Sequence, residues 1–314
     1  MTLTASPVAA GNQEPAPVRR TAGSVAAGLL RGTRPKQWVK QALVVAAPAA
    51  AGVLDSAQGI GRTAVAGVAF TLAAGGTYLV NDASDVEADR HHPTKRTRPL
   101  ASGQVPLALG WAVGIGLLVA GPLLGWLAAG WRLGAVLATY VALTLAYSRR
   151  LKHVAIVELM VVAAGFVLRA LAGAAAVRVP LSEWFVIVAS SGALFMVVGK
   201  RYAEVTGLDE GGVGSRRILA EYPVAWLRQV RDVTVSVTLL AYCLFAFERG
   251  ALVHASVPWY QLSIVPVTLG LLRYALLLER GQGGAPEEVV LRDRTLLVSG
   301  LVWAVLFGLG VAGV

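Results

Sequence analysis

Residues 63–89 read TAVAGVAFTLAAGGTYLVNDASDVEAD, in which 18 mainly apolar residues lead directly into a run with four acidic side chains. An apolar run of this length is typical of a membrane-spanning helix. Asp82, Asp85 and Asp89 follow an i, i+3, i+7 spacing, so on a helix they fall within an arc of about 60°, whereas Glu87 falls on the opposite side. The stretch therefore predicts a membrane helix whose end presents three carboxylates in one direction.

Basic side chains follow this acidic set. Lys95, Arg96 and Arg98 come six to nine residues after Asp89. Converging carboxylates suit Mg²⁺, and neighbouring cations suit the phosphate oxygens that usually complete its coordination. The alternative is a solvated helix end with mixed charges, but charge beside a membrane span is costly to keep without a use. We therefore predict that the three aspartates are catalytic metal ligands and that Asn81 and the three cations contact a diphosphate substrate.

The composition places this element in a polytopic membrane protein. Of the 314 residues, 56% are hydrophobic and 15% charged, and the mean hydropathy is +0.63, values typical of helical membrane proteins. We see no period-two alternation that would indicate strands, and lipid-exposed backbone must be helical or form a closed barrel. The sequence predicts an all-α bundle of nine transmembrane helices, at about 38–54, 63–80, 105–128, 132–147, 154–177, 184–199, 233–248, 257–278 and 293–312.

The distribution of positive charge predicts the orientation. With nine spans, 23 of the 28 Lys and Arg residues lie on the side of the N-terminus, and four lie on the other side. The positive-inside rule then puts the N-terminus and the acidic site in the cytoplasm and the C-terminus outside, in a multi-pass plasma-membrane protein. The net charge of +10 reflects topology and anionic lipid, so we expect no nucleic-acid partner. Residues 1–33, rich in Ala, Pro, Gly and Thr, are predicted to be a disordered cytoplasmic tail, and 34–314 a single transmembrane catalytic domain.

A second long cytoplasmic connection follows the sixth predicted span, at about 200–232. Lys200, Arg201 and Tyr202 begin it, and we predict that they bind the far end of the substrate, two as phosphate clamps and one as a hydroxyl donor. The simpler interpretation is an i, i+4 ion pair between Lys200 and Glu204 on the helix surface.

The connection between spans 4 and 5 adds further candidates. Tyr147 and Lys152 lie in its basic segment YSRRLKH, which is either a topology anchor or a site for a lipid phosphate. Glu158 and Arg169 are eleven residues apart and share one face of span 5. An arginine this deep in a span faces the bundle interior, where an ion pair with another helix and substrate contact are both open. We include all four residues among the predicted substrate-binding positions.

Several motifs carry a resemblance to a known family. The NDxxDxxxD element at 81–89, on a nine-span bundle, resembles the UbiA superfamily of intramembrane prenyltransferases. Five stretches are more narrowly similar to the decaprenyl-phosphate phosphoribosyltransferases of actinobacteria: HPTKRTRPLASG at 92–103, YSRRLKH at 147–153, LRALAGA at 168–174, GKRYAE at 199–204 and AFERG at 246–250. The resemblance covers about residues 33–312.

The resemblance implies a function. It implies a Mg²⁺-dependent membrane enzyme that moves 5-phosphoribosyl from phosphoribosyl diphosphate to decaprenyl or another polyprenyl phosphate, for arabinan (arabinogalactan) cell-wall precursors. Aromatic prenyltransferases of the superfamily carry a second aspartate motif after span 6, and here that loop begins with Lys200 and Arg201. A prenyltransferase acting on an aromatic acceptor is the alternative, and a transporter of a phosphorylated solute is a remote one. The lipid bilayer is a partner, and a homo-oligomer is compatible with the sequence.

Overall fold

The computed structural model describes residues 21–206, 217–253, 255–282 and 286–314, and these residues form helices and connections without a β-strand. The all-α prediction is therefore confirmed. In chain order the α-helices are α1 (Ala22–Gly32), α2 (Leu43–Ala50), α3 (Ala57–Ser84), α4 (Val86–His91), α5 (Leu107–Ala129), α6 (Trp131–Arg149), α7 (Val157–Val177), α8 (Glu183–Val205), α9 (Val224–Leu252), α10 (Trp259–Leu262), α11 (Ile264–Glu279), α12 (Pro286–Arg292) and α13 (Arg294–Ala312). Short 3₁₀ helices are η1 (Pro35–Ala42), η2 (Val53–Asp55), η3 (Lys95–Thr97), η4 (Leu151–His153) and η5 (Arg217–Glu221).

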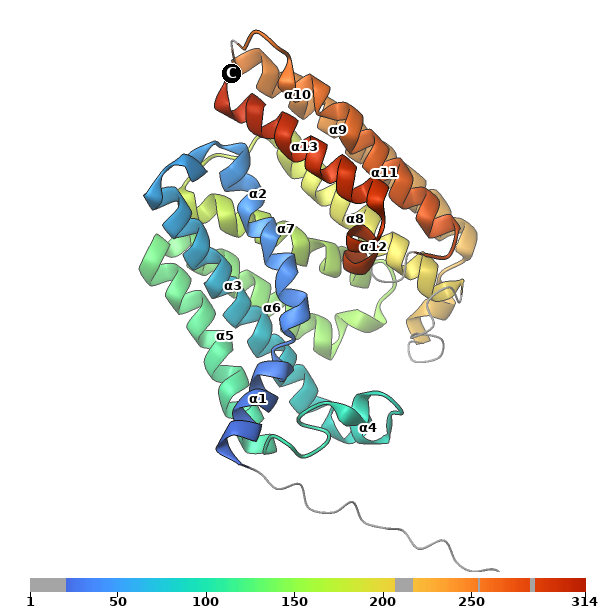
Figure 1. Cartoon of the computed structure of the whole chain (residues 1–314). Coiled ribbons are helices and arrows are strands. Elements are labelled where there is room, and N and C mark those ends of the chain that lie inside the picture. The colour runs from blue at the N-terminus through green and yellow to red at the C-terminus, as the bar shows by residue number, and fades with distance from the viewer. Residues whose placement is uncertain (1–20, 207–216, 254, 283–285) are drawn as a thin grey trace, which may run out of the picture.

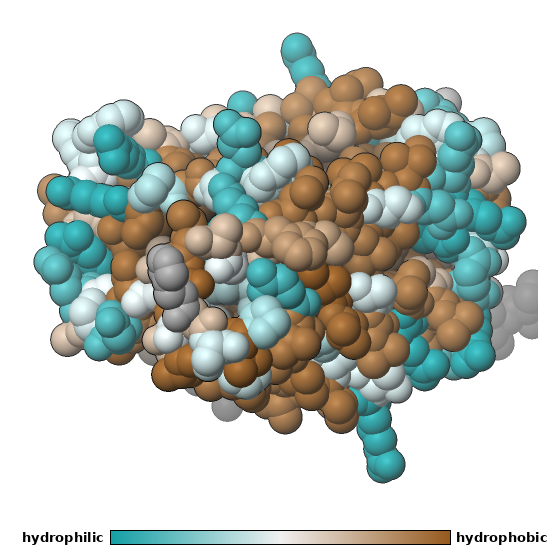
Figure 2. All heavy atoms as spheres, turned by 90° about the horizontal axis from the view of Figure 1, so that it is seen from above, coloured by the Kyte–Doolittle hydropathy of each residue, from teal (hydrophilic) through white to brown (hydrophobic). Residues whose placement is uncertain are grey.

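Seven of the helical stretches in the described residues are long and apolar enough to cross a membrane: α3, α5, α7, α8, α9, the stretch Trp259–Glu279, and α13. The two other predicted spans are also helical, as η1 with α2 and as α6, but they are not among these seven. The number nine therefore stays a prediction, while the protein is an integral membrane protein. Figure 2 shows a band of apolar side chains between two hydrophilic ends of the molecule. Exposed Leu240, Val265 and Leu301 are of the kind that meets lipid.

Glycines allow the helices that carry the site to approach closely. A Cβ on Gly76 of α3 would lie 2.8 Å from the backbone oxygen of Gly114 in α5. A Cβ on Gly173 of α7 would lie within van der Waals overlap, 1.9 Å, of the Val44 carbonyl oxygen in α2. The hydrophobic effect does not drive helices together within lipid. Membrane helices associate instead through close van der Waals packing, which small residues at the crossings allow. Because α3 also packs against α2 and α7, the four helices α2, α3, α5 and α7 form one packed unit.

The N-terminal segment is ordered from residue 21 onward. Thr21 and Ser24 form a reciprocal capping box at the start of α1, which satisfies N–H groups that a helix start otherwise leaves open. Gln104, in the turn before α5, accepts a hydrogen bond from Arg31 Nη2 (2.6 Å) and donates one to the Ser24 carbonyl oxygen (2.6 Å). The expectation of a disordered tail over residues 1–33 is therefore wrong from Ala22 onward, and residues 1–20 lie outside the described residues. Figure 1 shows α1 and α4 at the end of the bundle opposite the C-terminus.

Candidate active site

The acidic element does not form one continuous helix. Helix α3 ends at Ser84, and Asp85 separates it from α4 with φ −97° and ψ 9°. Asp82 and Asp89 are buried (4% and 3% exposed), while Asp85 is exposed at the break. Glu87 points to solvent and pairs with Arg90 at 2.7 Å. The expectation that three carboxylates share one face of a single helix is therefore corrected, because the chain turns at the middle aspartate.

The two buried carboxylates meet at one arginine. Arg98 Nη1 donates to Asp82 Oδ1 at 3.0 Å and to Asp89 Oδ2 at 2.7 Å. Arg34 Nη2 donates to the same Asp82 oxygen at 2.7 Å. Charge-assisted bonds of this length are the strong class of hydrogen bond, so each carboxylate is held in a fixed position. Arg98, predicted to contact a phosphate, contacts the aspartates in this structure.

The donor set fits a hard divalent cation. Oxygens of Asp82 and Asp89 both lie within 3.0 Å of one guanidinium nitrogen, so the pair already converges on a single positive group. Mg²⁺ is usually bound by one or two carboxylates together with substrate phosphates and water. In the parts of the chain that the structure describes, no three or more acidic, His or Cys side chains gather as a metal-binding group, and Asp85 stands apart from the pair. A cation held here would thus draw its remaining ligands from substrate.

Arg34 is not among the site residues predicted from the sequence. It stands between α1 and η1 in the left-handed region, with φ 57° and ψ 68°, where a non-glycine residue is uncommon and strained. Its guanidinium lies 4.7 Å from the ring centre of Tyr78, a cation–π distance. Pro35, which follows it, indicates only that a helix ends here, because the residue before a proline is disfavoured in the α region; it does not indicate the contact with Asp82.

Three further predicted substrate-binding residues are close in sequence to the acid pair. Lys95 is half-buried and Arg96 is exposed, both in the turn η3. Asn81 is half-buried one residue before Asp82, and its backbone oxygen accepts from the Asp85 N–H at 3.0 Å, which closes the last turn of α3. These three side chains are near the site by their place in the chain, and their substrate contacts stay predictions.

A second cluster of buried charge joins α7 to α8. Arg201 Nε and Nη2 each donate to Glu158, both at 2.8 Å, and its Nη1 donates to Glu204 at 2.7 Å. Glu158 is only 1% exposed. The simpler expectation of a Lys200–Glu204 pair is wrong, because Arg201 takes Glu204 and Lys200 is exposed. Arg201 is thus held by two carboxylates, and Lys200 is the cation of this segment that faces outward.

Tyr222 connects the loop after α8 to this cluster. Its hydroxyl accepts from the Ile156 N–H at 2.9 Å and donates to Glu158 Oε1 at 3.4 Å. Ile156 has φ 66°, an outlier for a β-branched residue that persists only where neighbouring contacts enforce it. Burial raises the pKa of the Tyr222 hydroxyl, so the group remains protonated around neutral pH and available as a donor. The strained backbone at the start of α7 is therefore stabilised by a hydrogen bond from Ile156 to Tyr222, which lies in the connection between α8 and α9.

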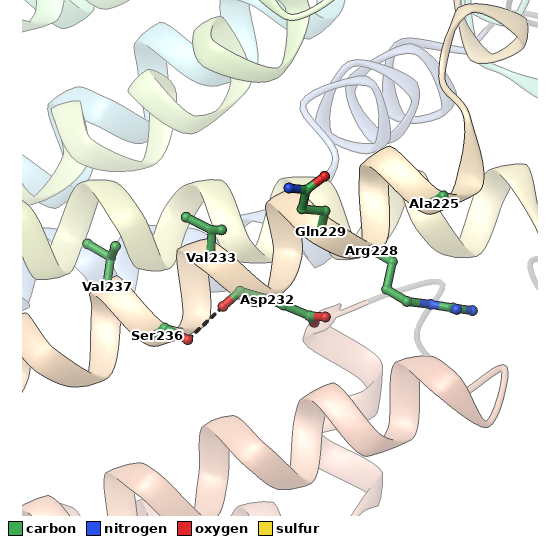
Figure 3. Close-up of a pocket in the computed structure, with 7 residues that line it drawn as sticks. All are labelled: Ala225, Arg228, Gln229, Asp232, Val233, Ser236 and Val237. Atoms are coloured by element: carbon green, nitrogen blue, oxygen red, sulfur yellow. Dashed lines mark hydrogen bonds between the residues drawn. The ribbon is translucent and has the colours of Figure 1, made fainter.

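Tyr202 belongs to a third polar group, at the ends of α8, α9 and α11. Its hydroxyl donates to Glu279 Oε2 at 3.1 Å and accepts from Arg228 Nη2 at 3.2 Å. Arg228 borders a hollow of about 610 Å³ along α9, which Figure 3 shows with Asp232 and Gln229 on different sides of the helix. The hollow contains none of the predicted site residues in its lining, so it is separate from the acid pair.

Arg169 is placed far from the acid pair along the bundle. Its guanidinium stacks over the rings of Phe70 (4.7 Å) and Tyr140 (5.2 Å), and Nε donates to Gln41 at 3.2 Å. Phe70 precedes Asp82 by twelve residues on α3, a rise of about 18 Å. No carboxylate pairs with Arg169 among the described residues, so the ion pair left open from the sequence is replaced by aromatic contacts. Arg169 links η1, α3, α6 and α7, and its predicted substrate contact stays a prediction.

Tyr147 is at the end of α6, and Lys152 is in the connection that follows it. Thr77 of α3 and Thr144 of α6 approach to 3.4 Å, so the ends of these helices lie side by side and Tyr147 is one turn beyond. Tyr147 is also close enough to Arg201 for electrostatic interaction, and Lys152 is half-buried in η4 between α6 and α7. The end of α3, the α6–α7 connection and the end of α8 therefore surround one region at the same end of the bundle.

Comparison with known proteins agrees with this arrangement. The UbiA prenyltransferase family matches residues 41–297. The chain belongs to that family. It is 42% identical over 288 residues to the decaprenyl-phosphate phosphoribosyltransferase of Corynebacterium glutamicum, covering 91% of this chain and 87% of the relative. It is 42% identical over 299 residues to the enzyme of that name from Mycobacterium tuberculosis H37Rv, covering 94% and 98%.

Solved structures show the same fold at lower identity. A UbiA homologue from Archaeoglobus fulgidus bound to GPP and Mg²⁺ superposes with a TM-score of 0.65 and 16% identity, over 91% of this chain and 99% of that one. A digeranylgeranylglyceryl phosphate synthase structure gives a TM-score of 0.66 at 16% identity, over 92% and 99%. The UbiA-like architecture and the narrower resemblance indicated by the motifs are thus confirmed.

Proposed function

We propose that this chain transfers the 5-phosphoribosyl group of phosphoribosyl diphosphate to a polyprenyl phosphate such as decaprenyl phosphate, with release of diphosphate. The observation that carries the proposal is the buried pair Asp82–Asp89 with Arg34 and Arg98 at the polar end of a membrane bundle. The 40–42% identity to enzymes named for this reaction supports the choice of substrates.

Asp82 and Asp89 would hold Mg²⁺, while Asp85 is exposed at the break between α3 and α4 and stands apart from the pair. A bound Mg²⁺ supplies neutralisation of the charge that develops on the leaving diphosphate. Arg98, Lys95 and Arg96 bind diphosphate oxygens, and their positive charge favours departure of that group from C1.

The acceptor needs little chemical activation. A polyprenyl phosphate is already an anion, so its oxygen attacks C1 without a general base while the C1–diphosphate bond breaks. The transition state resembles an oxocarbenium ion, as in other glycosyl transfers. Attack opposite the leaving group inverts C1 and gives a β-linked phosphoribosyl lipid. The chain's residues therefore act by positioning and electrostatics.

The far end of the donor lies toward the second charge cluster. The 5-phosphate would be bound there by two cations, Lys200 and Lys152, and by the hydroxyl of Tyr147. Arg201 is held by Glu158 and Glu204 and has a structural role in this proposal. We further propose that this end faces the cytoplasm of the plasma membrane and that the lipid product serves arabinan synthesis in the cell wall.

Lipid-dependent release of diphosphate tests the proposal. Purified protein in lipid nanodiscs receives Mg²⁺ and phosphoribosyl diphosphate, with or without decaprenyl phosphate. We expect release only with the lipid, and a fall of about 100-fold or more in Asp82→Asn and Asp89→Asn, because loss of a metal ligand removes several kcal/mol of stabilisation. Glu87→Gln, on the exposed side of α4, is the matched control and keeps wild-type turnover.

Turnover of prenyl diphosphate with an aromatic acceptor, and none with phosphoribosyl diphosphate, would favour the prenyltransferase alternative. Uptake of a phosphorylated solute into liposomes without release of diphosphate would favour a transporter.

A further inference from the structure

Asp82 receives two arginines that come from distant parts of the chain. Arg98 follows α4, whereas Arg34 stands 48 residues before Asp82, at the junction of α1 and η1. Both guanidiniums donate to the same oxygen, Asp82 Oδ1, at 2.7 and 3.0 Å. The sequence motifs single out Arg98 alone, so the role of Arg34 follows only from the fold.

The charges of Asp82, Asp89, Arg34 and Arg98 sum to zero. Asp82 and Asp89 carry two negative charges, and Arg34 and Arg98 carry two positive charges. The arginines neutralise the same two carboxylates that a divalent cation would bind, and they repel a cation placed there, so arginine and metal compete for the carboxylate charge. A divalent cation bound there leaves two positive charges in excess in a partly buried site, where uncompensated charge is costly. A diphosphate brought with the metal supplies the anion that both need.

The two chain segments that contain Arg34 and Arg98 are joined by hydrogen bonds. Gln104, at the end of the segment that begins with Arg98, accepts from Arg31 and donates to the Ser24 carbonyl oxygen in α1, each at 2.6 Å. Arg34 follows directly after α1, with φ 57° and its guanidinium over the Tyr78 ring. A strained residue so fixed is typical of a functional position. Its side chain is 35% exposed and can therefore reach a ligand without unpacking the bundle.

We infer that Arg34 is a diphosphate-binding residue that acts with Arg98. The two guanidiniums hold Asp82 and Asp89, and they transfer to the donor's diphosphate when Mg²⁺ takes the carboxylates. This rests on the proposed function, because it deepens the same site. Planar guanidiniums suit this task, since each offers two parallel donors to phosphate oxygens.

Two binding measurements with opposite expected signs test the inference. The probes are Mn²⁺ alone, counted by electron paramagnetic resonance, and inorganic diphosphate in the presence of Mg²⁺, measured by calorimetry. Arg34→Gln removes a competitor for Asp82, so Mn²⁺ alone is expected to bind at least about fivefold more tightly. The same variant loses a charge-assisted bond to the anion, so diphosphate is expected to bind about tenfold more weakly or worse. Arg98→Gln is expected to shift both affinities in the same directions.

Controls separate this role from a structural one. Arg292→Gln, in an exposed pair with Glu288 on α12, changes neither affinity. Arg34→Lys keeps the charge without the planar fork, and we expect it to weaken diphosphate binding less than Arg34→Gln. If Arg34→Gln weakens both ligands together, or changes neither, the inference is overturned.

The binding results also distinguish this inference from the proposed function, since neither probe requires phosphoribosyl transfer. Opposite shifts in a protein that fails to label decaprenyl phosphate would retain the arginine pair and reject the proposed substrates.

Discussion

The replacement Arg201→Gln tests whether this arginine supports the fold or binds substrate. Arg201 is 3% exposed and makes two 2.8 Å bonds to Glu158, which is 1% exposed, and one 2.7 Å bond to Glu204. Without the guanidinium, the buried Glu158 keeps only the weak 3.4 Å bond from Tyr222. Removing one partner of a buried pair costs about 3–5 kcal/mol, because the other charge remains without compensation.

The assay is thermal unfolding in detergent, followed by size-exclusion chromatography, together with donor KM and kcat for the protein that remains folded. A loss of this size corresponds to a fall in apparent Tm on the order of 10 °C. Arg228→Gln on α9 is the matched control. Its side chain is 53% exposed and lies 3.5 Å from Glu279, so its loss is expected to leave the apparent Tm nearly unchanged.

A double variant, Glu158→Leu with Arg201→Met, separates the pair from its surroundings. Replacing both partners of a buried ion pair by apolar groups is often neutral, so we expect it to recover part of the lost stability, limited by the carboxylate of Glu204. The reasoning would be refuted if Arg201→Gln unfolded at the wild-type temperature while donor KM rose strongly. That result would assign Arg201 to substrate.

Three further predictions concern packing and positioning. Gly173→Ala brings a Cβ to within 1.9 Å of a backbone oxygen of α2 and is expected to lower the free energy of unfolding by about 1–3 kcal/mol or more. Gly67→Ala meets no atom within 4 Å and is expected to raise it by up to about 1 kcal/mol. The apparent Tm of each variant tests these expectations. Gln104→Ala releases α1, so donor KM should rise several-fold with kcat nearly unchanged, and an unchanged KM would argue against the α1 contact. Tyr222→Phe leaves the N–H of strained Ile156 without its partner and should cost about 1–3 kcal/mol in the same Tm assay, so a wild-type Tm would exclude this fastening.

The helical fold and the position of the acid site could be predicted from the sequence because both depend on local patterns. Apolar runs report membrane helices directly, and the acids that follow residue 80 end one of these runs. The break at Asp85 was not predicted. The spacing of the three aspartates is compatible with one helix, and nothing in the spacing indicates that the helix is interrupted at the middle one. Asp82 and Asp89 still converge, through Arg98, although the helix between them is interrupted.

Contacts between distant residues could not be predicted. Arg34 and Asp82 are 48 residues apart, and Arg201 and Glu158 are 43 apart, so nothing in their spacing pairs them. The spacing of four residues predicted an ion pair between Lys200 and Glu204. In the structure Arg201 pairs with both Glu204 and the buried Glu158. Helix α1 was missed because its Ala- and Gly-rich sequence resembles a flexible tail, although Thr21 and Ser24 carried a readable N-cap signal.

The most direct test of the account follows the ribosyl group itself. Protein in nanodiscs is given Mg²⁺, decaprenyl phosphate and phosphoribosyl diphosphate labelled in the ribose, and label is counted in the organic phase. We expect label to enter that phase only when both Mg²⁺ and the lipid phosphate are present, and to disappear in Asp82→Asn. Absence of label from wild-type protein, together with transfer of a labelled prenyl chain from its diphosphate to an aromatic acceptor, would contradict the proposed function.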